Sequence, residues 1–524
     1  MTFSRSLKSI ARAPFIAIAC AIFGVLISVL LVLANFVIHL IGGFEPGPVS
    51  QVVDAVAEHL PLVFGGLGFL AAFMTDTPLA SVFGSARWAN KTELRKLSSA
   101  DDGLLIGRDP RTEKLLRYEG PAHLLTMAPT RTGKGVCTLI PNLLTAERSV
   151  ICIDPKGENV GITARAREQF GPVHNLDPFG VTGKRSAAFN PLDMLDANGP
   201  DVAEDANTLA DALVFDEPGM SGDAHWNEEA KALVAGLILK IVVAESPGRR
   251  TLATLREYLT LAPERFLGLL ARMQDMDDAG GLIARAANRH LGKSDREAAG
   301  VLSAAQRHTH FLDSPRMTAV LGRSDFRFSD LRRDNVTVFL VLPPDRLSSY
   351  SRWLRLLITQ SLTDMARDST IPARPVLYLL DEFAALGHLA PIERAMGLMA
   401  GYGVQLWPIL QDIHQLRATY GRRASTFLSN AAVLQVFGVN DIETAELIAR
   451  TVGKTDVNYV TRSWSEGKNS SSEHISARDL INADEIMRLP EGRMILLRQG
   501  QRPAWVKKLR YYDDPEFKGA YDRT

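Results

Sequence analysis

Residues 123–135 read H-L-L-T-M-A-P-T-R-T-G-K-G, and this stretch determines the fold. It begins with an apolar run typical of a buried strand, His123–Ala128, and continues into a loop that ends in Gly-Lys-Gly. The helix-compatible run Val136–Leu144 follows directly. A strand, such a loop and a helix in this order form a phosphate-binding loop, in which backbone N–H groups and the helix N-terminus point at the phosphates. The stretch therefore predicts an α/β nucleotide-binding domain.

The loop departs from the usual pattern, G-x-x-x-x-G-K-[ST], at two positions. Ala128 stands at the first glycine, and Gly135 replaces the hydroxyl residue that contacts Mg²⁺. We predict that Lys134 neutralises the β- and γ-phosphates of ATP. The expected nucleotide contacts are Ala128, Pro129, Thr130, Arg131, Thr132, Gly133, Lys134, Gly135 and Val136. The alternative is a glycine-containing turn with an exposed lysine.

A second predicted strand ends in two adjacent carboxylates, because residues 376–382 read V-L-Y-L-L-D-E. We predict that Asp381 holds Mg²⁺ through water and that Glu382 orients the attacking water. The alternative for Asp381 is a helix N-cap at a strand-to-helix junction. Its combination with an upstream phosphate loop favours an ATPase.

Other polar residues follow predicted strands. Gln411 ends the run Gln405–Leu410 and is a candidate sensor of the γ-phosphate, with an exposed loop glutamine as the alternative. The sequence D-P-K-G-E at 154–158 ends another strand and borders the nucleotide or a subunit interface in this interpretation. Arg422 and Arg423 are candidate arginine fingers for a neighbouring subunit, although a solvated basic turn is the preferred interpretation.

Six apolar runs predict buried parallel strands, because they lack the polar alternation of half-exposed strands. They are His123–Ala128, Ser149–Ile153, Val336–Leu342, Val376–Leu380, Gln405–Leu410 and Val433–Val439. Helical patterns separate them, which predicts a doubly wound α/β domain over 81–194 and 313–524. Between 195 and 312, apolar residues recur at helical spacing and predict an inserted all-α domain. The serine-rich stretch 463–476 predicts a mobile loop.

The first 80 residues predict a transmembrane helix hairpin. Residues 14–41 contain no Asp, Glu, Lys or Arg. As a helix they are about 42 Å long, against a hydrocarbon core of about 30 Å. A second apolar stretch covers about 60–76. A signal peptide is the alternative for the first span, but its apolar stretch is typically shorter, about 7–15 residues.

Flanking charges predict the orientation of the hairpin. The intervening residues 43–59 are acidic and contain no Lys or Arg. Basic residues flank the pair of spans, namely Arg5, Lys8 and Arg12 before it and Arg87, Lys91, Arg95 and Lys96 after it. Both ends are therefore expected in the cytoplasm. Gly65, Gly66 and Gly68 predict close lateral contacts between helices in the membrane.

The composition excludes several classes of protein. Among 524 residues, 59 Lys plus Arg balance 59 Asp plus Glu, and 46% are hydrophobic. These values exclude a disordered chain and a disulfide scaffold, and they disfavour a protein that coats nucleic acid by bulk charge. Cys20, Cys137 and Cys152 have no metal-ligand spacing and are interpreted as buried apolar residues.

An acidic cluster begins the predicted all-α domain. Residues 195–245 contain 11 acidic and 2 basic residues. Nine of the acidic residues lie within 29 residues: Asp201, Glu204, Asp205, Asp211, Asp216, Glu217, Asp223, Glu228 and Glu229. Because a DNA-binding surface is expected to be basic, the cluster favours a basic protein partner. A solvated acidic face is the alternative.

Together these features resemble the type IV secretion coupling proteins, the TraG-like conjugation ATPases. The resemblance covers nearly the whole chain. Besides the hairpin, the phosphate loop and Gln411, it rests on G-S-A-R-W-A at 84–89, D-P-K-G-E at 154–158, N-P-L at 190–192, L-D-E-F at 380–383, G-Y-G at 401–403 and D-E-I-M-R-L-P at 484–490. Gly135 is usual in that family. Some members carry a basic residue, a proposed arginine finger, near the G-Y-G, where this chain has Ala400.

The resemblance implies a RecA-like motor domain, an all-α domain at its cytoplasmic end, and a homo-hexameric ring at the cell inner membrane. It implies ATP-driven delivery of substrates to the components of a type IV secretion channel. The substrates are relaxase-bound single-stranded DNA, effector proteins, or both. One alternative is an FtsK-like DNA translocase of related fold, for which more spans, a long linker and a winged helix would be expected. A receptor with a vestigial phosphate loop is another, against which intact Lys134, Asp381 and Glu382 argue.

Overall fold

A computed structural model describes residues 2–42, 47–74, 82–215, 224–368, 370–465 and 468–523. The chain divides into two compact units. One comprises residues 1–83 with 458–475, and the other comprises 84–457 with 476–524. The first contains two long helices, α1 (Thr2–Gly42) and α2 (Pro48–Met74). By length and composition, Ile16–Ile38 and Pro48–Phe69 can each cross a membrane.

Helices α1 and α2 pack as an antiparallel pair. A Cβ atom on Gly24 would lie 2.8 Å from the Pro61 Cα, so only glycine permits this approach. The Ser28 hydroxyl donates a hydrogen bond to the Ala57 carbonyl at 2.6 Å. Small residues and interhelical hydrogen bonds are typical of helix pairs in membranes.

Two of the predicted glycine contacts form within this pair. A Cβ on Gly68 would lie 2.7 Å from the Cys20 Cβ, and one on Gly65 would lie 3.4 Å from the Ala21 Cβ. Gly66 alone faces open space. Two of the three glycines are therefore used to join α2 to α1.

Helix α2 begins earlier than predicted. The sequence places a loop at 43–59, but α2 already starts at Pro48, and the predicted end at 76 lies outside the described residues. Asp54 is thus inside the helix, where its Oδ1 accepts a hydrogen bond from Asn35 Nδ2 at 3.2 Å. Proline fits the first turn of a helix, and a polar partner on the facing helix accommodates the carboxylate.

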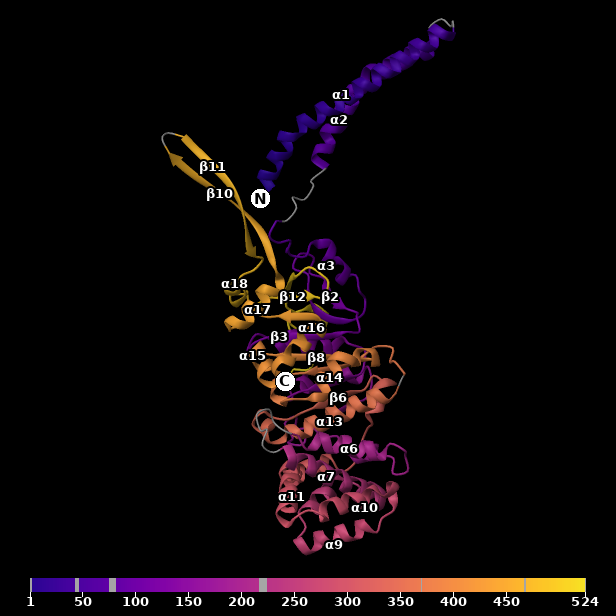
Figure 1. The fold of residues 1–524 in the computed structure, drawn as a ribbon, viewed down its shortest axis with the longest axis vertical. Helices are drawn as coiled ribbons and strands as arrows, with labels where there is room; N and C mark the ends of the chain where they lie inside the picture. Colours follow the sequence, from indigo (N-terminus) through magenta and orange to yellow (C-terminus); the bar gives the residue numbers. More distant parts are fainter. Residues whose placement is uncertain are drawn as a thin grey trace. The chain divides into compact units, whose positions relative to one another are not determined.

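The second unit contains an eleven-stranded mixed sheet (Figure 1). Its order is β2-β1-β13-β12-β9-β3-β8-β7-β4-β6-β5. The parallel strands are β3 (His123–Met127), β4 (Val150–Ile153), β5 (Val173–Leu176), β6 (Thr337–Leu340), β7 (Val376–Leu380), β8 (Val404–Leu410) and β9 (Ala431–Val436). The six predicted strands are all present and all pair in parallel, which confirms the α/β fold class.

The parallel strands are covered on both faces. Leu377 and Leu379 of β7 belong to one apolar cluster, whereas Tyr378 and Leu380 belong to another. Successive side chains of a strand point to opposite faces, so the two clusters lie on opposite sides of the sheet. The flanking helices are α3 (Lys91–Ser98), α4 (Ile140–Thr145), α5 (Glu158–Glu168), α13 (Leu347–Arg367), α14 (Ala390–Leu398), α15 (Ile413–Tyr420), α16 (Ala424–Asn430), α17 (Ile442–Val452) and α18 (Ala483–Met487).

An antiparallel extension of the sheet was not predicted. It consists of β1 (Leu104–Arg108), β2 (Leu115–Tyr118), β12 (Arg493–Arg498) and β13 (Ala504–Lys507), and β12 pairs with β9. All four of these strands contain an arginine or a lysine, which interrupts the apolar run. They therefore lack the long apolar pattern that identifies the central strands.

The serine-rich stretch 463–476 is not the predicted loop. It belongs to β10 (Lys454–Ser465) and β11 (Lys468–Asp479), which form a separate two-stranded sheet. The rings of Tyr459 and His474 stack with their centroids 5.4 Å apart. Backbone pairing and this cross-strand contact outweigh the low strand preference of the serine-rich sequence.

All regular structure described between 202 and 309 is helical. The main helices are α6 (Val202–Leu213), α7 (Ala224–Ala244), α8 (Leu252–Leu259), α9 (Pro263–Gln274), α10 (Asp278–Leu291) and α11 (Asp295–Thr309). In Figure 1 this helical block lies beyond α13, away from the strands. Because contacts assign it to the same compact unit as the sheet, the predicted domain boundaries at 195 and 312 stay a prediction.

Candidate functional site

The predicted site residues follow three adjacent parallel strands, β3, β8 and β7. The register pairs Met127 with Leu410, and Leu380 with Pro408. The loop after β3, Gln411 after β8 and the two carboxylates after β7 therefore leave the sheet at the same edge. The strand order, which the sequence does not give, brings these segments together.

The phosphate loop folds as a compact turn. The Thr132 amide and hydroxyl both donate to the Pro129 carbonyl, at 3.3 and 2.7 Å. Arg131 and Gly133 have positive φ angles of 63° and 89°. Among the described residues, the backbone amides of four consecutive residues donate no hydrogen bond: Gly133, Lys134, Gly135 and Val136. Free amides at the start of a helix form a site for an anion such as phosphate.

Lys134 contacts both carboxylates that follow β7, across the intervening strand β8. Its Nζ lies 3.5 Å from Asp381 Oδ1 and donates a hydrogen bond to Glu382 Oε1. The side chains of Lys134 and Asp381 are only 14% and 15% exposed, whereas that of Glu382 is 33% exposed. Burial raises the pKa of Asp381, although the charge of Lys134 opposes this shift.

Glu382 is the point where the three segments meet. Gln411 Nε2 donates to Glu382 Oε2 at 3.2 Å, while Lys134 binds the other carboxylate oxygen. Glu382 has φ 48° and ψ 42°, a left-handed conformation that costs a non-glycine residue roughly 1–3 kcal/mol. Such strain concentrates at functional sites, and Arg131 in the phosphate loop shares it.

Asp154 lies beside this group of residues. Ile153 pairs with Leu380 in the sheet, so Asp154 and Asp381 follow adjacent parallel strands. Asp154 is 1% exposed, and its Oδ2 accepts a hydrogen bond from the Val160 amide at 2.9 Å. Burial is the main cause that raises the pKa of Asp154 to about 7, and the charge of Asp381 adds to it. D-P-K-G-E thus borders the candidate site.

These residues fit a nucleotide with Mg²⁺. The loop offers free amides and a lysine, and Asp381 supplies a carboxylate. A Cβ atom on Gly135 would meet no atom within 4 Å, so space remains where other phosphate loops carry a hydroxyl. Among the described residues, no group of three His, Cys, Asp or Glu side chains could hold a metal by itself. Mg²⁺ usually binds through one or two carboxylates together with phosphates and water, which suits this site.

The candidate arginine fingers lie on a turn before α16. Arg423 donates to Glu393 Oε1 at 2.7 Å, and Glu393 Oε2 lies 3.2 Å from His388 Nε2. Arg422 is exposed. The geometry agrees with the solvated basic turn, and a role for either arginine in a neighbouring subunit stays a prediction.

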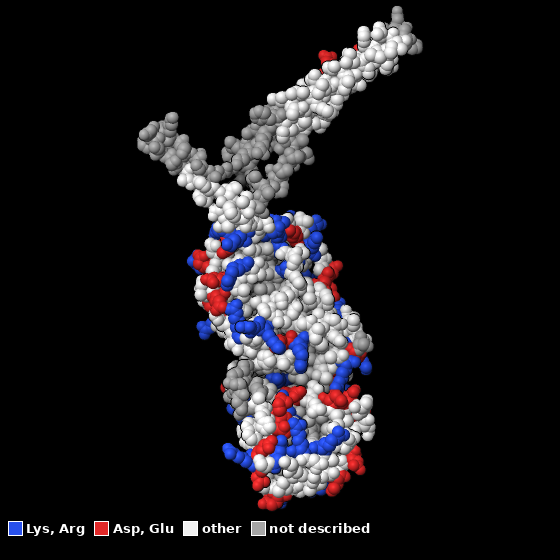
Figure 2. Space-filling view, viewed as in Figure 1, with Lys and Arg blue, Asp and Glu red and all other residues white. Residues whose placement is uncertain are grey.

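Part of the acidic cluster of the helical block is paired with basic residues of the same chain. Asp205 is buried and bonded by Arg367 of α13. Glu229 is bonded by Arg289 at 2.6 Å and by Lys293 at 2.8 Å. Acidic and basic side chains are interspersed on the visible face of the block (Figure 2). Asp216, Glu217 and Asp223 lie outside the described residues. Asp201 and Glu204 are exposed, and the docking of a basic partner on this cluster stays a prediction.

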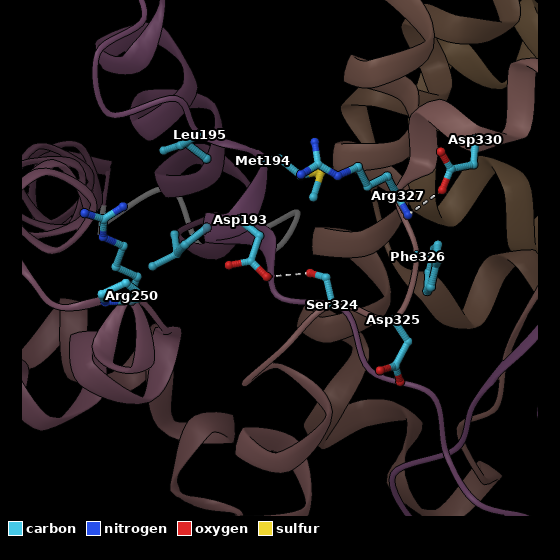
Figure 3. A pocket seen from close by; sticks show the side chains of 11 residues that line it. Asp193, Met194, Leu195, Arg250, Ser324, Asp325, Phe326, Arg327 and Asp330 are labelled. Atoms are coloured by element: carbon cyan, nitrogen blue, oxygen red, sulfur yellow. Dashed lines mark hydrogen bonds between the residues drawn. The ribbon is translucent and has the colours of Figure 1, made fainter.

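A cavity of about 560 Å³ lies apart from these residues, at the base of the helical block. Its lining includes Arg250, Arg327 and three carboxylates (Figure 3). All three carboxylates accept hydrogen bonds from neighbouring protein groups: Asp193 from the Ser324 hydroxyl at 2.7 Å, Asp325 from the Ala188 amide at 2.9 Å and Asp330 from the Arg327 amide at 2.9 Å. None of the predicted site residues lines this cavity.

Comparison with known proteins places the chain in context. Residues 87–523 match the family model described as type IV secretory system conjugative DNA transfer. The conjugal transfer protein TraG of Escherichia coli is 28% identical, over 88% of this chain and 82% of that protein. The protein VirD4 of Rhizobium rhizogenes is 27% identical, over 88% of this chain and 71% of that protein.

Solved structures of similar fold include the bacterial conjugative coupling protein TrwB. Its unbound form, TrwBdeltaN70, has a TM-score of 0.65 at 18% identity and covers 83% of this chain and 96% of its own. TrwB in complex with ADP and Mg²⁺ has a TM-score of 0.63 at 18% identity and covers 83% of this chain and 97% of its own. This likeness shows the RecA-like fold that the sequence resemblance implies.

Proposed function

The chain belongs to the type IV secretory system conjugative DNA transfer family, and on that premise we propose that it is a membrane-anchored coupling ATPase. It recruits relaxase-bound single-stranded DNA, effector proteins, or both, and delivers them to a type IV secretion channel. ATP hydrolysis drives this delivery. The observation that carries the proposal is the convergence of Lys134 and Gln411 on the two carboxylate oxygens of Glu382.

The phosphate loop binds the nucleotide in this proposal. The free amides after Thr132 and the Lys134 ammonium bind the phosphates, and Asp381 holds Mg²⁺ through water. When bound, Mg²⁺ neutralises charge on the β- and γ-phosphate oxygens. Support comes from TrwB, whose structures contain ADPNP, or ADP with Mg²⁺.

Glu382 activates the water that attacks the γ-phosphate. Lys134 engages Glu382 Oε1 in the structure. When Lys134 instead contacts a phosphate, Oε1 is released and can accept a proton from water. Gln411 stays on Oε2 and fixes the orientation of the carboxylate. Gln411 therefore links the end of β8 to the water-activating group.

The apolar hairpin anchors the motor in the cell inner membrane, with both termini in the cytoplasm, and the assembled form is a homo-hexamer. The orientation rests on the basic residues that flank the two spans. The hexamer rests on the resemblance to coupling proteins. The family match does not favour the FtsK-like alternative.

A transfer assay tests the proposal. Donor cells that lack the gene would be complemented with the wild-type chain or with Lys134→Ala, and transfer of a mobilisable plasmid and of a reporter-tagged effector would be counted separately. We expect the wild-type chain to restore at least one kind of transfer and Lys134→Ala to restore neither. Transfer by Lys134→Ala at the wild-type level would contradict an ATP-driven role.

A further inference from the structure

Lys508, near the C-terminus, donates a hydrogen bond to the phosphate loop. Lys508 Nζ donates a hydrogen bond to the Thr132 carbonyl at 3.0 Å. Its ammonium also lies 4.2 Å from the centroid of the Phe437 ring. Phe437 follows β9, and its amide bonds to Met127 at the end of β3. Lys508 follows β13, so the antiparallel extension of the sheet delivers it to the loop.

The hydrogen bond from Lys508 to the Thr132 carbonyl also fixes the direction in which the Gly133 amide points. The Thr132 carbonyl and the Gly133 N–H belong to one planar trans peptide, in which the two groups point in opposite directions. A carbonyl held toward Lys508 therefore directs the Gly133 N–H away from it. Gly133 is the first of the four consecutive free amides in the loop. The lysine thus orients one of the amides that are free to bind a phosphate.

Lys508 is held in place independently of its ammonium group. Its backbone amide bonds to the Gly492 carbonyl at 3.0 Å. The next residue, Leu509, is fully buried in an apolar cluster with Ile140 and Leu144 of the helix that follows the loop. Removing only the ammonium should therefore leave the chain path intact.

The adjacent lysine provides a contrast. Lys507 Nζ pairs with Glu113 at 2.7 Å on the surface, where the two side chains are 39% and 54% exposed. Lys508 is partly buried, and burial lowers its pKa. Water therefore screens the Lys508 bond less than it screens the Lys507 ion pair.

We propose that Lys508 is a positioning residue of the phosphate loop, which orients the Gly133 amide and thereby sets the affinity for the nucleotide phosphates. The inference rests on the proposed function, because it requires that the loop bind a nucleotide.

Nucleotide affinity of the full-length chain in detergent tests the role. Lys508→Met keeps the length of the side chain but removes the donor, Lys508→Arg keeps a cationic donor, and Lys507→Met is the matched control. The readouts are the Kd for ADP, the KM and kcat for ATP, and the melting temperature without nucleotide. For Lys508→Met we expect the Kd and KM to rise about tenfold, the scale of one hydrogen bond from a charged donor.

The pattern across variants separates positioning from a merely structural role. We expect kcat of Lys508→Met to stay within about threefold of wild type, since lost ground-state binding raises KM rather than lowering kcat. Lys508→Arg should recover most of the affinity, and Lys507→Met should bind like wild type. If Lys508→Met loses its native melting transition, its nucleotide affinity no longer tests the inference, and Lys508→Arg is used instead. Nucleotide binding by Lys508→Arg as weak as that of Lys134→Ala would overturn the inference.

Two failures are distinguishable. A wild-type chain that binds no ADP would overturn the proposed function and this inference with it. A wild-type chain that binds ADP, together with a Lys508→Met variant that binds it equally well, would overturn the inference alone.

Discussion

Replacing Gln411 by alanine isolates its contact with the water-activating carboxylate. In the structure Gln411 Nε2 donates to Glu382 Oε2 at 3.2 Å, and Lys134 occupies Oε1. Once Lys134 contacts a phosphate, Gln411 is the remaining described side chain that fixes the Glu382 carboxylate. Without it, a side chain on a strained backbone can rotate away from the water, so hydrolysis slows while nucleotide binding persists.

The expected magnitude follows from the exposure of the contact. A hydrogen bond to a charged group contributes about 1.5–3 kcal/mol. The Glu382 side chain is 33% exposed, which favours the lower limit. About 1.4 kcal/mol corresponds to a tenfold change in rate, so Gln411→Ala should lower kcat about tenfold. The Kd for ATP should stay within about twofold of wild type, since uniform binding is unaffected.

Steady-state ATP hydrolysis and equilibrium nucleotide binding, measured on the same preparation, test this prediction. The exposed Gln169, at the end of α5, provides a matched Gln→Ala control that should leave both quantities unchanged. Full kcat in Gln411→Ala would refute the reasoning. So would a loss of ATP affinity as large as the loss of kcat, because Gln411 would then act on binding.

Three further predictions concern the carboxylates and the hairpin. Glu382→Gln should bind ATP but hydrolyse it slowly, whereas Asp381→Asn should weaken the binding of Mg-ATP itself. Identical Kd values for Mg-ATP in the two variants would contradict this division of roles. Deleting residues 1–80 should leave a soluble, folded protein, because the apolar clusters lie within the second unit. Its oligomer should be weaker, because the lateral contacts of the hairpin in the membrane are lost. Sedimentation would contradict this prediction if the truncated protein stayed as firmly hexameric as the whole chain. Asp154 has a folded pKa of about 7 against an ordinary 3.8, so its ionisation destabilises the fold increasingly as pH rises through this window. Asp154→Asn should therefore raise the melting temperature of the nucleotide-free protein more at pH 8 than at pH 5, and an equal effect at both values would contradict the assignment.

The central strands could be predicted because burial on both faces imposes continuous apolar runs. β7 coincides with the predicted run Val376–Leu380, and all its residues are buried. β1, β2, β12 and β13 escaped prediction because an arginine or a lysine in each of them interrupts the apolar run. The serine-rich strand β11 escaped because backbone pairing with β10, rather than residue preference, forms it.

Motifs nominate the candidate site residues, but their contacts could not be predicted from the sequence. A sequence shows that Lys134, Glu382 and Gln411 each follow a strand, yet only the strand order places β8 between β3 and β7. The role of Lys508 depends on the antiparallel extension, which the sequence did not reveal. The partner of Asp205 could not be predicted either, because Arg367 lies on a helix distant in sequence.

ATP turnover by the purified full-length chain, compared with Lys134→Ala, tests the central claim most directly. The account requires Lys134 to stabilise charge on the phosphates, and loss of one such donor lowers kcat by about a hundredfold or more. We expect measurable Mg²⁺-dependent turnover in the wild type and a fall of at least about a hundredfold in the variant. Equal turnover in the two preparations would contradict the account.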